Sequence, residues 1–133
     1  MQNKEELDIN VLLDNAYKAM DNAYAPYSKF HVGAAVLTAS GRIYHGCNIE
    51  NASYGATNCA ERTAIFKAVS EGERKIKAVA IVSDGGEFTP PCGICRQVMA
   101  EFMEADGLII LGNNKGEVKE YRLKDMLPLS FQL

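Results

Sequence analysis

The chain has 133 residues, 47% of them apolar and 23% charged, a balance that is typical of one soluble globular domain covering residues 1–133. Its net charge of −3 supplies no basic face for a phosphate backbone, which argues against nucleic acid as a partner. No apolar run is long enough to span a membrane, and the polar start MQNKEELDIN is unlike a secretion signal, so we expect a cytoplasmic protein without membrane contact.

The first predicted element is a helix, because apolar residues recur at three- and four-residue steps from Ile9 to Tyr24. Asp8 can cap its start and Pro26 stops it. Residues 31–50 then predict an antiparallel hairpin, since two apolar runs flank the short turn TASGR. Gly33 indicates that another backbone approaches the first strand closely.

A second helix is predicted over residues 58–72, with Asn58 as its cap and Gly72 at its end. The continuous apolar run at 76–83 predicts a strand that is covered on both faces. This strand leads into the next helical segment.

The third helix begins in PPCGICRQVMAEFMEADG, with Ile94 and Met103 in its inward stripe. A buried strand at 108–111, a weaker edge strand at 117–123 and a short helical turn near 124–127 follow. This order predicts an α/β fold with a single mixed sheet of about five strands and helices on both faces. The unit from 76 to 111 should form a right-handed parallel crossover.

Four cysteines in a reducing compartment favour metal binding or catalysis over disulfides. Cys92 and Cys95 form a C-x-x-C pair at a helix start, as in thioredoxin-like redox proteins, but the chain has no Trp and that function leaves Cys59 without a role. A closed structural zinc site would add Cys47 and Cys59, although these two cysteines do not form a second tight pair.

The third hypothesis places Cys59, Cys92 and Cys95 around one metal ion. Both helix starts would favour negative charge at the point where the three thiolates meet. Three protein ligands leave a fourth position open, which is the arrangement of a catalytic zinc. Glu61 lies two residues after Cys59 and could move protons.

Simpler roles compete for several of these residues. Glu61 could complete a capping box with Asn58. A buried strand thiol is the favoured role for Cys47, and ordinary core or surface roles are favoured for His31 and His45.

The motifs CAER, then PCGIC, and also GCNIENASYG, resemble those of the small zinc-dependent cytidine deaminases over most of the chain. The resemblance implies a cytidine deaminase-like three-layer fold and hydrolytic deamination of free cytidine and deoxycytidine, a reaction of pyrimidine salvage. It implies one Zn²⁺ per chain and a homotetramer whose sites are completed by neighbouring subunits.

Residue roles carry over from the same resemblance. Cys59, Cys92 and Cys95 match the zinc ligands, and Glu61 matches the proton-shuttling glutamate. The implied nucleoside contacts are Phe30, an aromatic near the nucleoside; Asn48 and Glu50 on the ribose hydroxyls; the Ala60 N–H on the pyrimidine carbonyl; and Tyr54 and Phe131 in a neighbouring subunit's site.

Arg62 is a predicted neighbour of the ligands rather than a ligand. Three thiolates around Zn²⁺ carry a net formal charge of −1, which a nearby cation can offset by donating to a thiolate sulfur. Alternatives to a cytidine deaminase are a deaminase of another aminated heterocycle such as blasticidin S, a thioredoxin-like protein and a non-catalytic zinc module.

Overall fold

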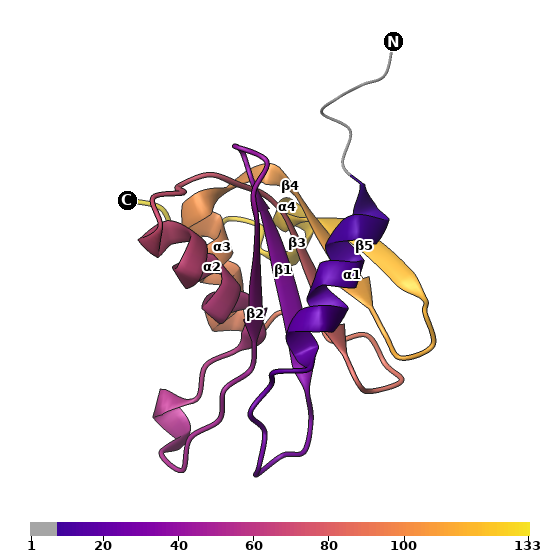
Figure 1. Ribbon diagram of the computed structural model, residues 1–133. Helices are drawn as coiled ribbons and strands as arrows, with labels where there is room; N and C mark the ends of the chain where they lie inside the picture. The colour runs from indigo at the N-terminus through magenta and orange to yellow at the C-terminus, as the bar shows by residue number, and fades with distance from the viewer. Residues whose placement is uncertain (1–7) are drawn as a thin grey trace.

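The computed structural model describes residues 8–133, and Figure 1 shows their elements around one sheet. The elements are α1 (Ile9–Met20), β1 (Val32–Thr38), β2 (Ile43–Cys47), the 3₁₀ turn η1 (Tyr54–Ala56), α2 (Ala60–Ser70), β3 (Ile76–Ser83), α3 (Gly93–Phe102), β4 (Met103–Gly112), β5 (Val118–Arg122) and α4 (Leu123–Met126). In this described part no helix has the length and apolar character needed to cross a membrane.

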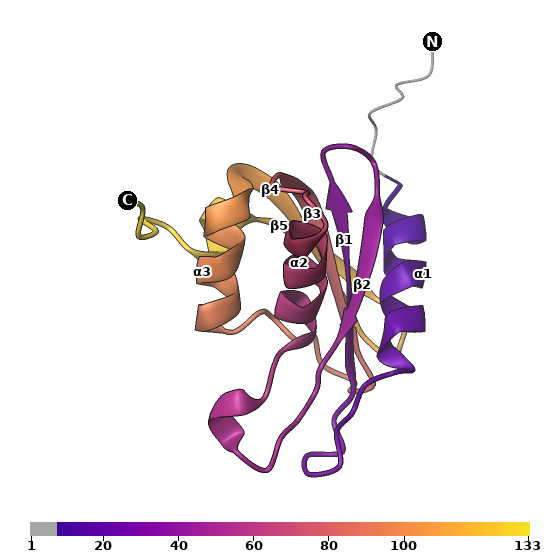
Figure 2. The same cartoon turned by 60° about the vertical axis from the view of Figure 1, so that its left-hand side comes forward.

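The five strands lie in the order β2-β1-β3-β4-β5. The β3–β4 pair is parallel and the other neighbouring pairs are antiparallel. Helix α1 covers one face of the sheet, and α2 and α3 cover the other (Figure 2). The predicted mixed α/β sheet with helices on both faces is therefore confirmed.

On each face of the sheet, one glycine allows a helix to pack closely. A Cβ on Gly33 would lie 2.1 Å from the carbonyl oxygen of Ala16 in α1, and a Cβ on Gly46 would lie 2.4 Å from that of Ala60 in α2. Any larger residue would push its helix off the sheet. The close approach predicted at Gly33 is present, and Gly46 determines how closely the start of α2 packs on the sheet.

Three details of the prediction were wrong at element ends. Helix α1 ends at Met20, and Tyr24 instead pairs with Ile49 as an isolated bridge and is exposed. Met103 begins β4 instead of continuing α3, and the side chain of Ile94 is 62% exposed rather than inward. Tyr24 and Met103 leave the helical pattern because their backbones pair with Ile49 and Ile76, and Ile94 lies in the first turn of α3 with its side chain in solvent.

Candidate active site

The starts of α2 and α3 meet at one corner of the sheet and bring three thiols together. The sulfur atoms of Cys59, Cys92 and Cys95 all lie within 4.8 Å of one another. Cys59 and Cys92 are the N-caps of the two helices, and within residues 8–133 neither cap has a side-chain hydrogen bond to the first turn. The first-turn N–H groups therefore remain as a positive end beside the sulfurs.

The donor set fits a zinc ion. All four cysteines of the described chain are free, and the Cys59 and Cys92 Sγ atoms are 3.8 Å apart. Zn–S bonds of about 2.3 Å in a tetrahedron put neighbouring sulfurs about 3.8 Å apart. Cys47 is not part of the cluster, as expected for a strand thiol, so the closed four-cysteine site is not formed.

The thiols differ in acidity. The hydrogen bond from Cys95 and the guanidinium of Arg62 lower the pKa of the Cys59 thiol to about 5, although burial opposes the shift. The hydrogen bond to Cys59 and burial raise the pKa of Cys95. One thiolate is thus already favoured at neutral pH, and a cation would favour the others.

Glu61 lies in the first turn of α2, beside the cysteines, and only 4% of it is exposed. Burial raises the pKa of its carboxyl group to about 7, and the charge of Cys59 adds to the effect. A carboxyl group with such a pKa can both take and give a proton at neutral pH. The capping box with Asn58 is wrong, because the Asn58 amide donates to Thr63 Oγ1 and Cys59 is the cap.

Arg62, also in the first turn of α2, contacts the thiol corner. Its Nη2 donates to Cys59 Sγ at 3.4 Å, while its buried Nε has no partner within the described chain. This contact agrees with the predicted role as a donor to thiolate sulfur.

The segment after β2 forms a polar rim next to α2. Ile49 pairs with Asn58 through two backbone hydrogen bonds, which places Asn48 and Glu50 beside the residue that precedes Cys59. The Asn48 Oδ1 accepts from Val32 N at 2.9 Å, and its Nδ2 donates to Phe30 O at 2.8 Å. Each end of the amide keeps one further hydrogen-bonding position for a ligand.

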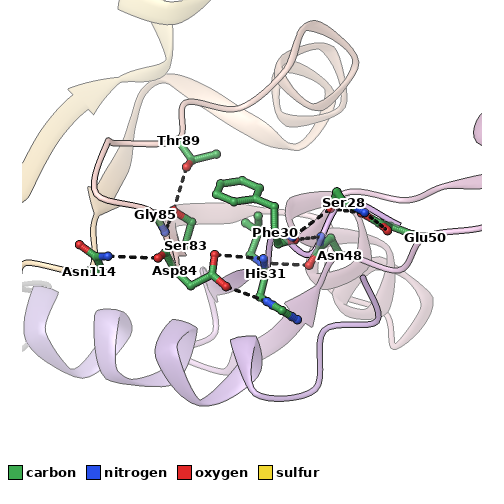
Figure 3. Close-up of polar contacts among 11 residues, drawn as sticks. Ser28, Phe30, His31, Asn48, Glu50, Ser83, Asp84, Gly85, Thr89 and Asn114 are labelled. Carbon is green, nitrogen blue, oxygen red and sulfur yellow. Dashed lines mark hydrogen bonds and ion pairs between the residues drawn. The ribbon is translucent and has the colours of Figure 1, made fainter. Parts of the chain in front are cut away.

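Glu50 holds the chain before Phe30. Its Oε1 accepts from the backbone N–H groups of Tyr27 (2.9 Å) and Ser28 (3.1 Å), and the Ser28 hydroxyl donates to Oε2 (Figure 3). The Ser28 hydroxyl lowers the pKa of Glu50. A cavity of about 420 Å³ opens here, and its lining includes Glu50 and Tyr54.

The remaining predicted residues differ in burial. Ala60 is buried at the start of α2, where its N–H has no intrahelical acceptor. Tyr54 in η1 is 84% exposed and Phe131 is 70% exposed, and Gln97 Nε2 donates to Phe131 O at 3.1 Å. These two rings contact solvent in the isolated chain.

Sequence reasoning gave no role to Asp84 or Gly85, which lie between β3 and α3. Asp84 pairs with His31, and Gly85 lies close to the edge of the Phe30 ring. No motif marks the two residues; the only available signal was the polar SDGG stretch directly after a buried strand. The other histidine, His45, lies in β2, and its Nε2 is 2.6 Å from Asn15 Oδ1 of α1.

Comparisons with known proteins agree with this geometry. Residues 8–111 match the family model described as "Cytidine and deoxycytidylate deaminase zinc-binding region". A cytidine deaminase of Halalkalibacterium halodurans is 52% identical over 125 residues, covering 94% of this chain and 95% of that protein. A crystal structure of cytidine deaminase from Burkholderia pseudomallei has a TM-score of 0.90 at 45% identity, with 94% of this chain and all of that chain covered.

A second solved structure, cytidine deaminase from Mycobacterium tuberculosis, has a TM-score of 0.83 at 41% identity over 96% of this chain and all of that chain. The fold and the thiol corner define a zinc-binding deaminase. The chain belongs to the cytidine and deoxycytidylate deaminase family.

Proposed function

We propose that this protein deaminates free cytidine and deoxycytidine by hydrolysis, giving the corresponding uridine and ammonia. The observation that carries the proposal is the meeting of three thiols with a buried carboxyl group at one corner of the sheet. Cytidine deaminases at 52% identity support the substrate class. A blasticidin-type deaminase is not favoured by these relatives.

Cys59, Cys92 and Cys95 would hold the metal. Bound there, Zn²⁺ lowers the pKa of a coordinated water toward ~7 and so supplies a nucleophile at neutral pH. Arg62, as a donor to Cys59 Sγ, would reduce the negative charge that the thiolates place on the site.

Glu61 would carry the protons. It takes one from the attacking water and gives it to N3 of the pyrimidine while the oxygen bonds to C4. It then moves the proton of the new C4 hydroxyl to the exocyclic amine, which leaves as ammonia. A carboxyl pKa raised to about 7 by burial suits both steps.

The polar rim would bind the sugar and the ring. Asn48 and Glu50 offer amide and carboxylate groups for the ribose hydroxyls, the Ala60 N–H offers a donor for the pyrimidine carbonyl, and Phe30 offers an apolar face. In the homotetramer that the family resemblance implies, the exposed rings of Tyr54 and Phe131 would complete a neighbouring subunit's site. A reducing compartment such as the cytoplasm suits a site built from free thiols.

The test is a nucleoside panel with metal analysis. Purified protein is mixed with cytidine, deoxycytidine, adenosine and blasticidin S, and loss of the amino-substituted chromophore is followed while zinc per chain is measured. We expect turnover of the two cytidines with one zinc per chain. Zinc without deamination of any compound would indicate a structural module, and thiol–disulfide exchange without zinc would indicate a redox protein.

A further inference from the structure

Phe30 lies in an irregular segment that nonetheless has a defined conformation. The segment joins α1 to β1, and Lys29 just before Phe30 has a φ of +61° in the left-handed region that non-glycine residues rarely occupy. Such a conformation persists only where the surroundings hold it.

Two carboxylates hold the segment, one on each side of Phe30 (Figure 3). Glu50 accepts from residues 27 and 28 before the ring, as described above. After the ring, Asp84 accepts from the His31 backbone N–H at 3.2 Å through Oδ1, and its Oδ2 is 2.7 Å from His31 Nδ1. The Asp84 N–H donates back to His31 O at 3.1 Å.

The residue after Asp84, Gly85, lies close to the edge of the Phe30 ring. A Cβ on Gly85 would lie 3.1 Å from Cε1 of Phe30, and the next nearest atom of that ring would be Cζ at 3.9 Å. A side chain at position 85 would therefore press on the edge of the Phe30 ring, which would have to move by a few tenths of an ångström.

The loop that carries Asp84 and Gly85 is held from behind. The Asn114 side chain donates to Asp84 O at 3.1 Å, and the Asn114 N–H donates to Gly85 O at 3.1 Å. Ser83 Oγ accepts from Gly85 N at 3.3 Å and from Thr89 Oγ1 at 3.0 Å (Figure 3). The same loop continues to Cys92, so one stretch of chain contacts Phe30 and ends at the thiol corner.

We propose that Asp84 and Gly85 are positioning residues for substrate binding, and that they act through Phe30: Asp84 holds the backbone at His31, and Gly85 leaves room for the edge of the Phe30 ring. The inference rests on the proposed deaminase activity. It adds to that activity two residues that touch neither the metal ligands nor Glu61, and whose loss should weaken nucleoside binding rather than the chemical step.

The test is a double-mutant cycle in cytidine deamination. Asp84→Ala and Gly85→Ala are each made in the wild-type protein and in Phe30→Ala, with Asp106→Ala as the matched control. Asp106 is also an exposed carboxylate with a basic partner, Lys124 Nζ at 3.0 Å. It lies in the first half of β4, whereas Asp84 follows the end of the parallel neighbour β3. Steady-state kcat and KM, zinc per chain and Tm are measured for each variant.

We expect Asp84→Ala to raise KM about three- to tenfold, as the loss of hydrogen bonds to one carboxylate would, with kcat within about twofold and zinc unchanged. Gly85→Ala should raise KM by a similar factor. In the Phe30→Ala background both changes should have almost no further effect, because residues that act through one another are not additive. Asp106→Ala should leave both constants unchanged.

Equal effects of Asp84→Ala in the two backgrounds, or a fall in kcat with loss of zinc, would overturn the proposal. Wild-type turnover of cytidine tests the proposed function separately, so the two can fail independently. Backbone amide relaxation supplies a readout without turnover: Asp84→Ala should raise the mobility of residues 28–31 and leave 59–61 unchanged. Unchanged mobility at residues 28–31 would also overturn the proposal. If Asp84→Ala does not fold, Asp84→Asn replaces it in every measurement.

Discussion

The helices on the two faces of the sheet pack on it in the same way, but the first turns of these helices are capped differently. Helix α1 packs on Gly33 and α2 packs on Gly46, with similarly short contacts. At the start of α1, however, the Asp8 side chain accepts from Asn10 N and Val11 N. The α2 and α3 starts have cysteine N-caps without such bonds in the described chain. Packing alone therefore does not make a site: the thiol corner lies where two helix starts without side-chain capping bonds come together.

Removing one cysteine from inside the thiol cluster and one from outside it is the strongest test of this comparison. Cys95→Ala should abolish measurable deamination and reduce bound zinc well below one per chain, because two remaining thiols do not fill a zinc site. Cys47→Ala, in β2 and outside the cluster, should keep zinc and turnover. Metal analysis and cytidine assays check both, and zinc loss in Cys47→Ala would contradict the assignment of ligands.

Glu61→Gln tests the proposed proton carrier separately from the metal site. The amide has the same shape but cannot move a proton, so kcat should fall by about 10²–10⁴-fold, the range of general acid–base catalysis. Zinc per chain should be unchanged. A variant that loses its zinc would show instead that Glu61 holds the corner together.

Arg62 should have an intermediate effect. Arg62→Ala removes the donor to Cys59 Sγ, and we expect zinc affinity or turnover to fall about 10–100-fold, the usual cost of losing an outer hydrogen bond to a metal ligand. Competition with a chelator measures the affinity. Arg62→Lys keeps the positive charge and should recover part of the loss; full activity in Arg62→Ala would remove this role.

Gly33 and Gly46, the glycines on which α1 and α2 pack, give a matched pair of substitutions with a smaller effect. Gly46→Ala and Gly33→Ala should each lower the free energy of unfolding by about 1–3 kcal/mol, because the added methyl group overlaps helix backbone. Only Gly46→Ala should also weaken zinc binding, since it moves the start of α2. Denaturant unfolding measures the loss of stability, and chelator competition measures the zinc affinity. Weaker zinc binding in Gly33→Ala as well would contradict the predicted difference.

Removing the cap of α1 should have the smallest effect. Asp8→Ala leaves two first-turn N–H groups without their acceptor and should cost about 1 kcal/mol of stability. Because that helix end is far from the thiols, kcat and KM for cytidine should not change. Urea unfolding monitored by circular dichroism measures the loss.

The order of elements and the thiol corner could be predicted because both depend on local signals. Apolar period and length mark the strands and helices, and two cysteine motifs at helix starts have few other uses. Element ends depend on distant partners instead. Tyr24 continues the helical pattern of α1 but leaves it to pair with Ile49, and Met103 leaves that of α3 to pair with Ile76.

The polar rim shows the same limit. Asn48 and Glu50 were singled out through their motif, yet their hydrogen bonds to the segment before β1 join residues 18 and 23 positions apart. Asp84 and Gly85 have no motif, and their relation to Phe30 follows only from the fold.

The separation of the thiols along the chain has a consequence for biosynthesis. Cys59 and Cys92 are 33 positions apart, and the parallel neighbour of β3 is β4, which ends at Gly112. In a growing chain Cys59 is therefore made 33 positions before Cys92, and the three thiols can meet only after Cys95 has been made. We expect zinc to be loaded onto an already folded protein, so that cells starved of the metal would accumulate an intact apoenzyme that regains activity when the metal returns.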